Sequence, residues 1–192
     1  MSRIKRFLKC RRAVIAAETA LAFPMVLAIG TLCADIYTIV LEREHMEQRA
    51  GAIASVLGYQ SELTTEGLQG LLDSVLPDEG LGNYQLLISN VRQTGKVYWQ
   101  LNRGNSTDLC ENGKVAADND YPGELPERDE DDGSDNVSMV VVELCRQGSD
   151  ISLLGGMSLS GLLQASTINR AAHGLVALDK TLAAEAGLEE KE

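Results

Sequence analysis

Glu18 is the residue of this chain whose chemistry most needs an explanation. It is the only charged residue in the 22-residue apolar stretch from Ala13 to Ala34. A carboxylate near the centre of a membrane-spanning helix costs about 2.5–3.5 kcal/mol, so it is rarely retained without a partner or a task. A positive charge on another molecule could offset this cost. Alternatively, a position near the membrane surface would let the carboxylate reach water or take up a proton.

Two of the four cysteines could form a disulfide. Cys110 and Cys145 lie together in the second half of the chain, whereas Cys10 precedes the apolar stretch and Cys33 lies within it. A bond between Cys110 and Cys145 would close a loop of 36 residues and stabilise the fold by about 3–4 kcal/mol in the chain-entropy model. The alternative is two free buried thiols. No Cys/His spacing indicates a zinc site.

The sequence contains no recognisable catalytic or cofactor-binding pattern. It lacks a Gly-x-Ser-x-Gly elbow, a phosphate-binding Gly-x-x-x-x-Gly-Lys loop and a His-Glu-x-x-His metal motif, and nothing catalytic flanks His45 or His173. The acidic run from Asp129 to Asp135 suggests calcium, but its spacing does not match an EF-hand loop. We therefore expect neither an enzyme nor a bound metal or other cofactor.

The element that must position Glu18 is the apolar stretch itself. A helix of 22 residues spans roughly 33 Å, about the thickness of a hydrocarbon core. By the positive-inside rule, the basic leader before it keeps the N-terminus in the cytoplasm and the rest is exported. The net charge is −11, and such an acidic exported part argues against nucleic-acid binding. The basic residues of the leader are Arg3, Lys5, Arg6, Lys9, Arg11 and Arg12.

Two common export signals fit this stretch poorly. A secretory signal has a short uninterrupted apolar core, whereas this stretch is long and contains Glu18 and Pro24. A lipoprotein signal would need a small residue directly before Cys33, but Leu32 stands there.

The residues around Glu18 resemble the class III signal of type IV pilin-like proteins: a basic leader, the small residue Ala13, and then Val14-Ile15-Ala16-Ala17-Glu18. The continuation to Pro24 resembles the TadE/TadF-type minor pilins, or pseudopilins, of the tight-adherence (Tad/Flp) type IVb pilus. Their leaders share a Glu, an Ala two residues later and a Pro six residues later. The resemblance covers residues 11–58 well, and Ala13 stands where the family usually has Gly.

This resemblance implies that prepilin peptidase cuts between Ala13 and Val14. Glu18 would then be the fifth mature residue and would pair with the Val14 amine of a neighbouring subunit, which would make Glu18 an assembly determinant together with Pro24. The implied partners are other pilin subunits, the assembly platform, the peptidase and the membrane. The implied location is the bacterial inner membrane with the C-terminal domain in the periplasm, and entry into the extracellular pilus stays open.

The implied function is a minor-pilin role in assembling a Tad/Flp pilus, and thus in surface adhesion. A minor role is expected because a large acidic head packs less readily into a helical shaft than a short major pilin does. The alternative is an uncleaved single-pass inner-membrane anchor that carries a periplasmic interaction domain.

The remaining pattern predicts an α+β fold, in which a long N-terminal helix continues into a head with a small antiparallel sheet. Apolar residues keep one face of the helix to about Leu57. We expect a second helix over 65–76 and strands over 84–91, 96–101, 137–144 and 163–170, the first two joined as a hairpin.

Four regions follow from this pattern. Residues 1–13 are the basic cytoplasmic leader, 14–58 the long helix, 59–173 the head and 174–192 a C-terminal tail. Within the head, residues 104–135 contain eleven acidic and two basic residues. We expect these to form a solvated surface loop, tethered at Cys110.

Overall fold

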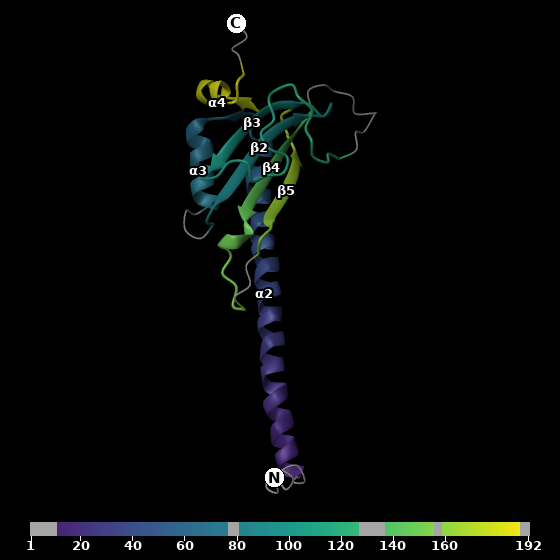
Figure 1. Ribbon diagram of the computed structural model, residues 1–192. Coiled ribbons are helices and arrows are strands. Elements are labelled where there is room, and N and C mark those ends of the chain that lie inside the picture. Colours follow the sequence, from purple (N-terminus) through teal and green to yellow (C-terminus); the bar gives the residue numbers. More distant parts are fainter. Residues whose placement is uncertain (1–10, 77–80, 127–136, 156–158, 189–192) are drawn as a thin grey trace. The chain divides into compact units, whose positions relative to one another are not determined.

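The computed structural model describes residues 11–76, 81–126, 137–155 and 159–188 (Figure 1). The chain divides into two compact units. We call residues 1–41 with 152–158 the helix unit, and residues 42–151 with 159–192 the head. One α-helix, α2 (Arg11–Tyr59), contributes residues to both units.

Helix α2 confirms the predicted long N-terminal helix and ends two residues beyond Leu57, the predicted end. Pro24 lies inside it. A proline cannot donate the backbone hydrogen bond of its position, and a membrane helix tolerates this where neighbours compensate. The fold class is therefore α+β with a long apolar N-terminal helix.

The head contains the predicted four-stranded antiparallel sheet. Its strands are β2 (Tyr84–Arg92), β3 (Val97–Gly104), β4 (Ser138–Gln147) and β5 (Leu162–Arg170), in the order β3-β2-β4-β5. The register places Ile88 of β2 between Leu101 of β3 and Val142 of β4. Gly95 has a φ of 87° in the β2–β3 turn, a conformation that glycine adopts without steric cost.

The head part of α2 packs on one face of this sheet. Arg146 of β4 contacts Glu42 of α2, and Asn169 of β5 hydrogen-bonds Ser55 of α2. Apolar side chains from both elements are fully buried between these contacts, as the helical spacing of the α2 residues predicts. The buried apolar side chains in the head part of α2 are Met46, Ala50, Ile53, Ala54 and Leu57.

Helix α3 (Thr65–Val75) agrees with the predicted second helix. Thr64 caps it by accepting a hydrogen bond from the N–H of Gly67 at 3.1 Å. Leu68 and Leu72 are its buried residues, so its apolar face is turned into the head.

The segment predicted as a C-terminal tail contributes structure to the head. Strand β6 (Ala177–Leu178) pairs in parallel with β1 (Glu62–Leu63). Helix α4 (Lys180–Glu185) follows, buries Leu182 and forms an ion pair between Glu185 and Arg103 of β3. These contacts link positions more than 80 residues apart, which local patterning cannot predict.

Candidate functional site

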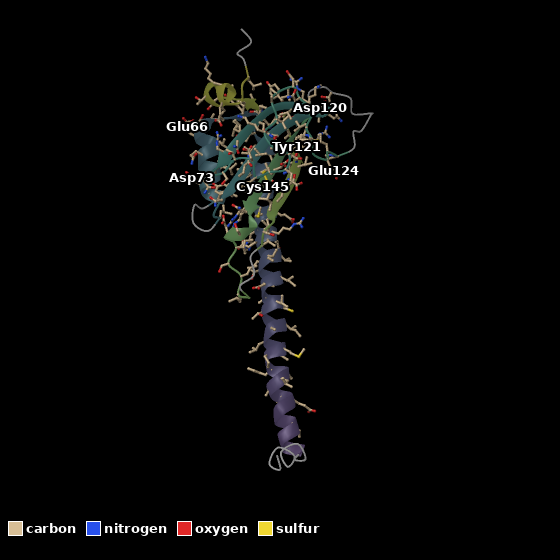
Figure 2. The ribbon with its side chains drawn as sticks, viewed as in Figure 1. Glu66, Asp73, Asp120, Tyr121, Glu124 and Cys145 are labelled. Atoms are coloured by element: carbon tan, nitrogen blue, oxygen red, sulfur yellow. A yellow bond between two sulfur atoms is a disulfide. The ribbon has the colours of Figure 1, made fainter. Side chains whose placement is uncertain are left out.

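The α2 segment of the helix unit exposes an extended apolar surface. One helix of the described residues, over Glu18–Tyr59, is long and apolar enough to cross a membrane. Figure 2 shows the side chains of this segment projecting outward from the helix. Water does not favour such a surface, so lipid or other apolar helices are its natural surroundings. The large exposed apolar residues are Ile15, Leu21, Phe23, Met25, Val26, Leu27, Ile29, Leu32, Ile36, Tyr37 and Val40.

Hydroxyl groups in this surface are satisfied by the helix itself. Thr19, Thr31 and Thr38 each donate to a backbone carbonyl three or four residues earlier, at 2.9 Å. Glu18 differs from them because it is exposed and makes no hydrogen bond or ion pair with another described residue. Its carboxylate is therefore available to a group outside this molecule.

The other sequence-predicted assembly residues lie on the same helix. Ala13 and Val14 are in the first turn of α2, since the helix begins at Arg11. Val14 and Glu18 are four residues apart, so the peptide bond proposed for cleavage lies about one helical turn before the carboxylate. Pro24 follows in the same helix.

Asp35 is a functional candidate that the sequence analysis did not identify. It directly follows the apolar stretch, and its side chain is buried. Oδ1 accepts the N–H of Leu154 at 2.7 Å, and Oδ2 accepts the N–H of Gly155 at 3.0 Å. All three residues belong to the helix unit. No local pattern signals this contact, because its partners lie about 120 residues away.

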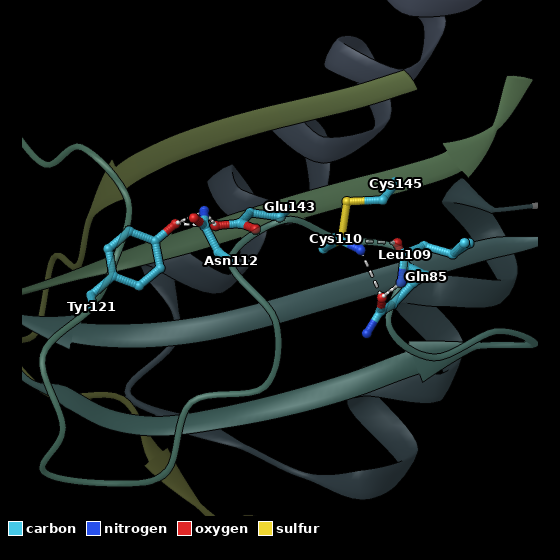
Figure 3. The surroundings of a disulfide bond; sticks show 7 residues. All are labelled: Gln85, Leu109, Cys110, Asn112, Tyr121, Glu143 and Cys145. Atoms are coloured by element: carbon cyan, nitrogen blue, oxygen red, sulfur yellow. Dashed lines mark hydrogen bonds between the residues drawn. A yellow bond between two sulfur atoms is a disulfide. The ribbon is translucent and has the colours of Figure 1, made fainter. Parts of the chain in front are cut away.

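The predicted disulfide is present in the head, between Cys110 and Cys145 of β4, with 5.4 Å between the Cα atoms (Figure 3). It lies on the sheet face opposite to α2, where it packs with Leu87 of β2. Beside it, the Gln85 carboxamide oxygen accepts the N–H groups of Leu109 and Cys110 at 2.7 and 2.9 Å. The bond and Gln85 together fix the start of the acidic segment on the sheet.

Glu143 lies two residues before Cys145 on β4, so both side chains are on the same face of the sheet. Glu143 holds the same segment at two more points. Its Oε1 accepts hydrogen bonds from the Asn112 amide at 2.7 Å and from the Tyr121 hydroxyl (Figure 3). Burial and the Glu143 carboxylate raise the pKa of the Tyr121 phenol far above its ordinary value. Tyr121 therefore stays protonated and remains a donor. Gln100 of β3 adds a further attachment by accepting the N–H of Val115 at 2.6 Å.

The described part of the acidic segment lies mostly at the surface and is tethered at Cys110, as expected, but it has further attachments that were not predicted. Between Leu109 and Tyr121 the segment is attached to the sheet, and Tyr121 packs in an apolar cluster with Val91, Val97 and Val141. Acidic side chains such as Asp120 and Glu124 still face solvent (Figure 2). The segment from Asp129 to Asp135 lies outside the described residues. Among the residues described, no group of three or more His, Cys, Asp or Glu side chains could hold a metal ion.

No protein-family model, curated protein or solved structure matches the chain. The arrangement of the site itself therefore carries the functional argument. The helix unit has an exposed apolar helix surface and an exposed carboxylate near the start of that helix. The head, considered separately, contains the disulfide.

Proposed function

We propose that this chain is a pilin-like subunit of the TadE/TadF type. It is anchored in the bacterial inner membrane by α2 and takes part in assembling a tight-adherence pilus for surface attachment. The observation that carries the proposal is Glu18, an exposed carboxylate with no partner among the described residues, in the otherwise uncharged and apolar stretch from Ala13 to Ala34. A membrane retains such a group where a positive charge meets it.

Cleavage between Ala13 and Val14 would create that charge. The new α-amino group is positive at neutral pH, and it would sit at the N-terminus of α2, where the helix dipole adds further positive potential. Both the α-amino charge and the helix dipole would then attract the Glu18 carboxylate of a neighbouring subunit. Since Val14 and Glu18 are four residues apart, this pairing would offset adjacent helices by about 6 Å along their axes.

The test of processing is the N-terminal sequence of the mature protein from membranes of cells with and without prepilin peptidase. A start at Val14 that depends on the peptidase supports the proposal. An intact leader in both strains supports the uncleaved anchor with a periplasmic interaction domain. That alternative is favoured by one observation, since the Ala13–Val14 bond lies within the regular helix α2.

The test of the carboxylate is the substitution Glu18→Gln, which keeps the shape and removes the charge. Loss of a buried ion pair costs about 3–5 kcal/mol, enough to reduce subunit association more than a hundredfold. We therefore expect the variant to be cleaved normally but to lose piliation and surface adhesion.

Thr19→Val is the matched control for Glu18→Gln, because the Thr19 hydroxyl already bonds the Ile15 carbonyl of its own helix. Piliation should be unchanged in this variant. If Glu18→Gln assembles pili as the natural chain does, Glu18 does not set the contact between subunits.

A further inference from the structure

Leu154 is an apolar side chain exposed next to the apolar helix. It is 80% exposed, and its N–H is bonded to Asp35 of α2. The α2 side chains that follow Asp35 are also apolar and exposed, among them Ile36, Tyr37 and Val40. Leu154 therefore adds to the same surface that α2 presents.

Asp35 does not interrupt this surface, although its charge suggests an end to the membrane-spanning stretch. Its side chain is only 1% exposed, and its oxygens accept two backbone N–H groups. With Asp35 covered, the exposed apolar surface continues from Leu21 to Val40. This is about 20 residues, or about 30 Å, which equals the thickness of a hydrocarbon core.

The backbone of the covering segment is suited to a position near lipid. Irregular backbone is costly there unless its polar groups are satisfied, and Asp35 satisfies the N–H groups of Leu154 and Gly155. The contact also depends on glycine. A Cβ atom at position 155 would lie 2.5 Å from Oδ2 of Asp35, which is too close.

We propose that Asp35 holds the segment 153–155 against α2 so that Leu154 inserts into the membrane–water interface on the periplasmic side of the inner membrane. Leu154 would be a second lipid contact beside the helix. Lipid is the occupant because Leu154 lies beside Asp35, within the roughly 30 Å of α2 over which the apolar surface is exposed and near its end at Val40. This inference rests on the membrane insertion of α2 in the proposed function.

The experiment places a single environment-sensitive fluorophore on the full chain, with the Cys110–Cys145 disulfide kept. Cys10 and Cys33 are replaced by serine, and Leu154→Cys supplies the labelling site. The labelled chain is reconstituted in vesicles of phosphatidylethanolamine and phosphatidylglycerol. Quenching is measured with iodide in water and with lipids that carry a nitroxide near the headgroup.

Two reference labels calibrate this measurement. Native Cys33, which is exposed on α2, reports whether the helix is inserted. Thr94→Cys, in the exposed β2–β3 turn of the head, reports the aqueous limit. We expect the label at 154 to be quenched by the nitroxide lipid at least twofold more than the label at 94, and by iodide at least twofold less.

Gly155→Ala tests the role of the Asp35 contact. It should make the label at 154 as accessible to iodide as the label at 94. Gly161→Ala is the matched control, because a Cβ atom there meets nothing within 4 Å, and it should change nothing.

Three results would overturn the inference. If the label at 154 is open to iodide while the label at 33 is quenched by lipid, α2 is inserted but Leu154 is not. If both labels are open to iodide, the membrane insertion of the proposed function fails as well. If the label at 154 is protected from both quenchers, protein covers Leu154, as a second copy of the chain would.

Discussion

Removal of the Cys110–Cys145 disulfide should destabilise the head by about 4 kcal/mol. The bond closes a loop of 36 residues. For this length the chain-entropy model gives an entropy loss of about 13 cal/mol/K in the unfolded chain, or about 3.8 kcal/mol at 25 °C. Replacement of both cysteines by alanine is the suitable perturbation, because Cys145 is fully buried and a serine hydroxyl there would need a partner.

Trp99 provides the assay. It is the only tryptophan in the chain, its side chain is fully buried, and its indole N–H donates to the Val176 carbonyl at 2.7 Å. Its fluorescence therefore reports unfolding of the head. In urea, with a slope of about 2 kcal/mol/M, a loss of 3.8 kcal/mol lowers the unfolding midpoint by about 2 M.

Cys33→Ala is the control for this experiment, since Cys33 is a free exposed thiol in the helix unit. Its midpoint should equal that of the natural chain. A reducing agent should lower the midpoint of the natural chain and leave the Cys110→Ala/Cys145→Ala variant unchanged. A shift below about 0.5 M in the double variant would show that loop closure does not set the stability of this head.

Two further predictions concern pH. Tyr121 should be the last of the five tyrosines to ionise, because burial and Glu143 raise the pKa of its phenol. The unfolded chain loses this proton near pH 10 and the folded chain keeps it, so stability should fall as pH rises above about 10. Near-ultraviolet absorbance of the natural chain and of Tyr121→Phe checks this, and five equivalent ionisations would contradict it. The pKa of the Asp179 carboxyl is lowered, mainly by the N–H of Leu182 and also by Thr65. Its stabilising contribution is complete above the unfolded pKa of about 3.9 and is lost as pH falls through the lower folded pKa. Asp179→Asn should therefore flatten the acid side of the stability profile, and identical acid profiles would rule this contribution out.

Regular elements of the head could be predicted because their signals are local. Along β5, Leu163 and Ala165 alternate with more exposed residues, and this period of two places them on the α2 side of the sheet. The spacing of Met46, Ala50 and Ile53 likewise predicted the buried face of α2.

The polar attachments on the other sheet face could not be predicted. Gln85, Gln100 and Glu143 stand in strands that mix apolar and polar residues, and the alternation of residue types does not show whether these three side chains are buried or exposed. Each accepts hydrogen bonds from donors distant in the sequence, as Oε1 of Glu143 does from Asn112 and Tyr121. The acidic composition of the segment after β3 predicted a surface loop tethered at Cys110, and it did not predict the additional attachments through Asn112, Val115 and Tyr121.

For the candidate site, the sequence by itself determined the apolar stretch, the isolated Glu18, the basic leader and the pair Cys110 and Cys145. These features are read from the composition and the spacing of residues along the chain. The tendency of an apolar stretch to leave water does not depend on how the rest of the chain folds. Only the tertiary structure decided that Asp35 is covered rather than exposed, and that Leu154 lies beside it. A carboxylate can be buried only when donors come to it, and those donors are supplied by the three-dimensional fold from a segment about 120 residues away.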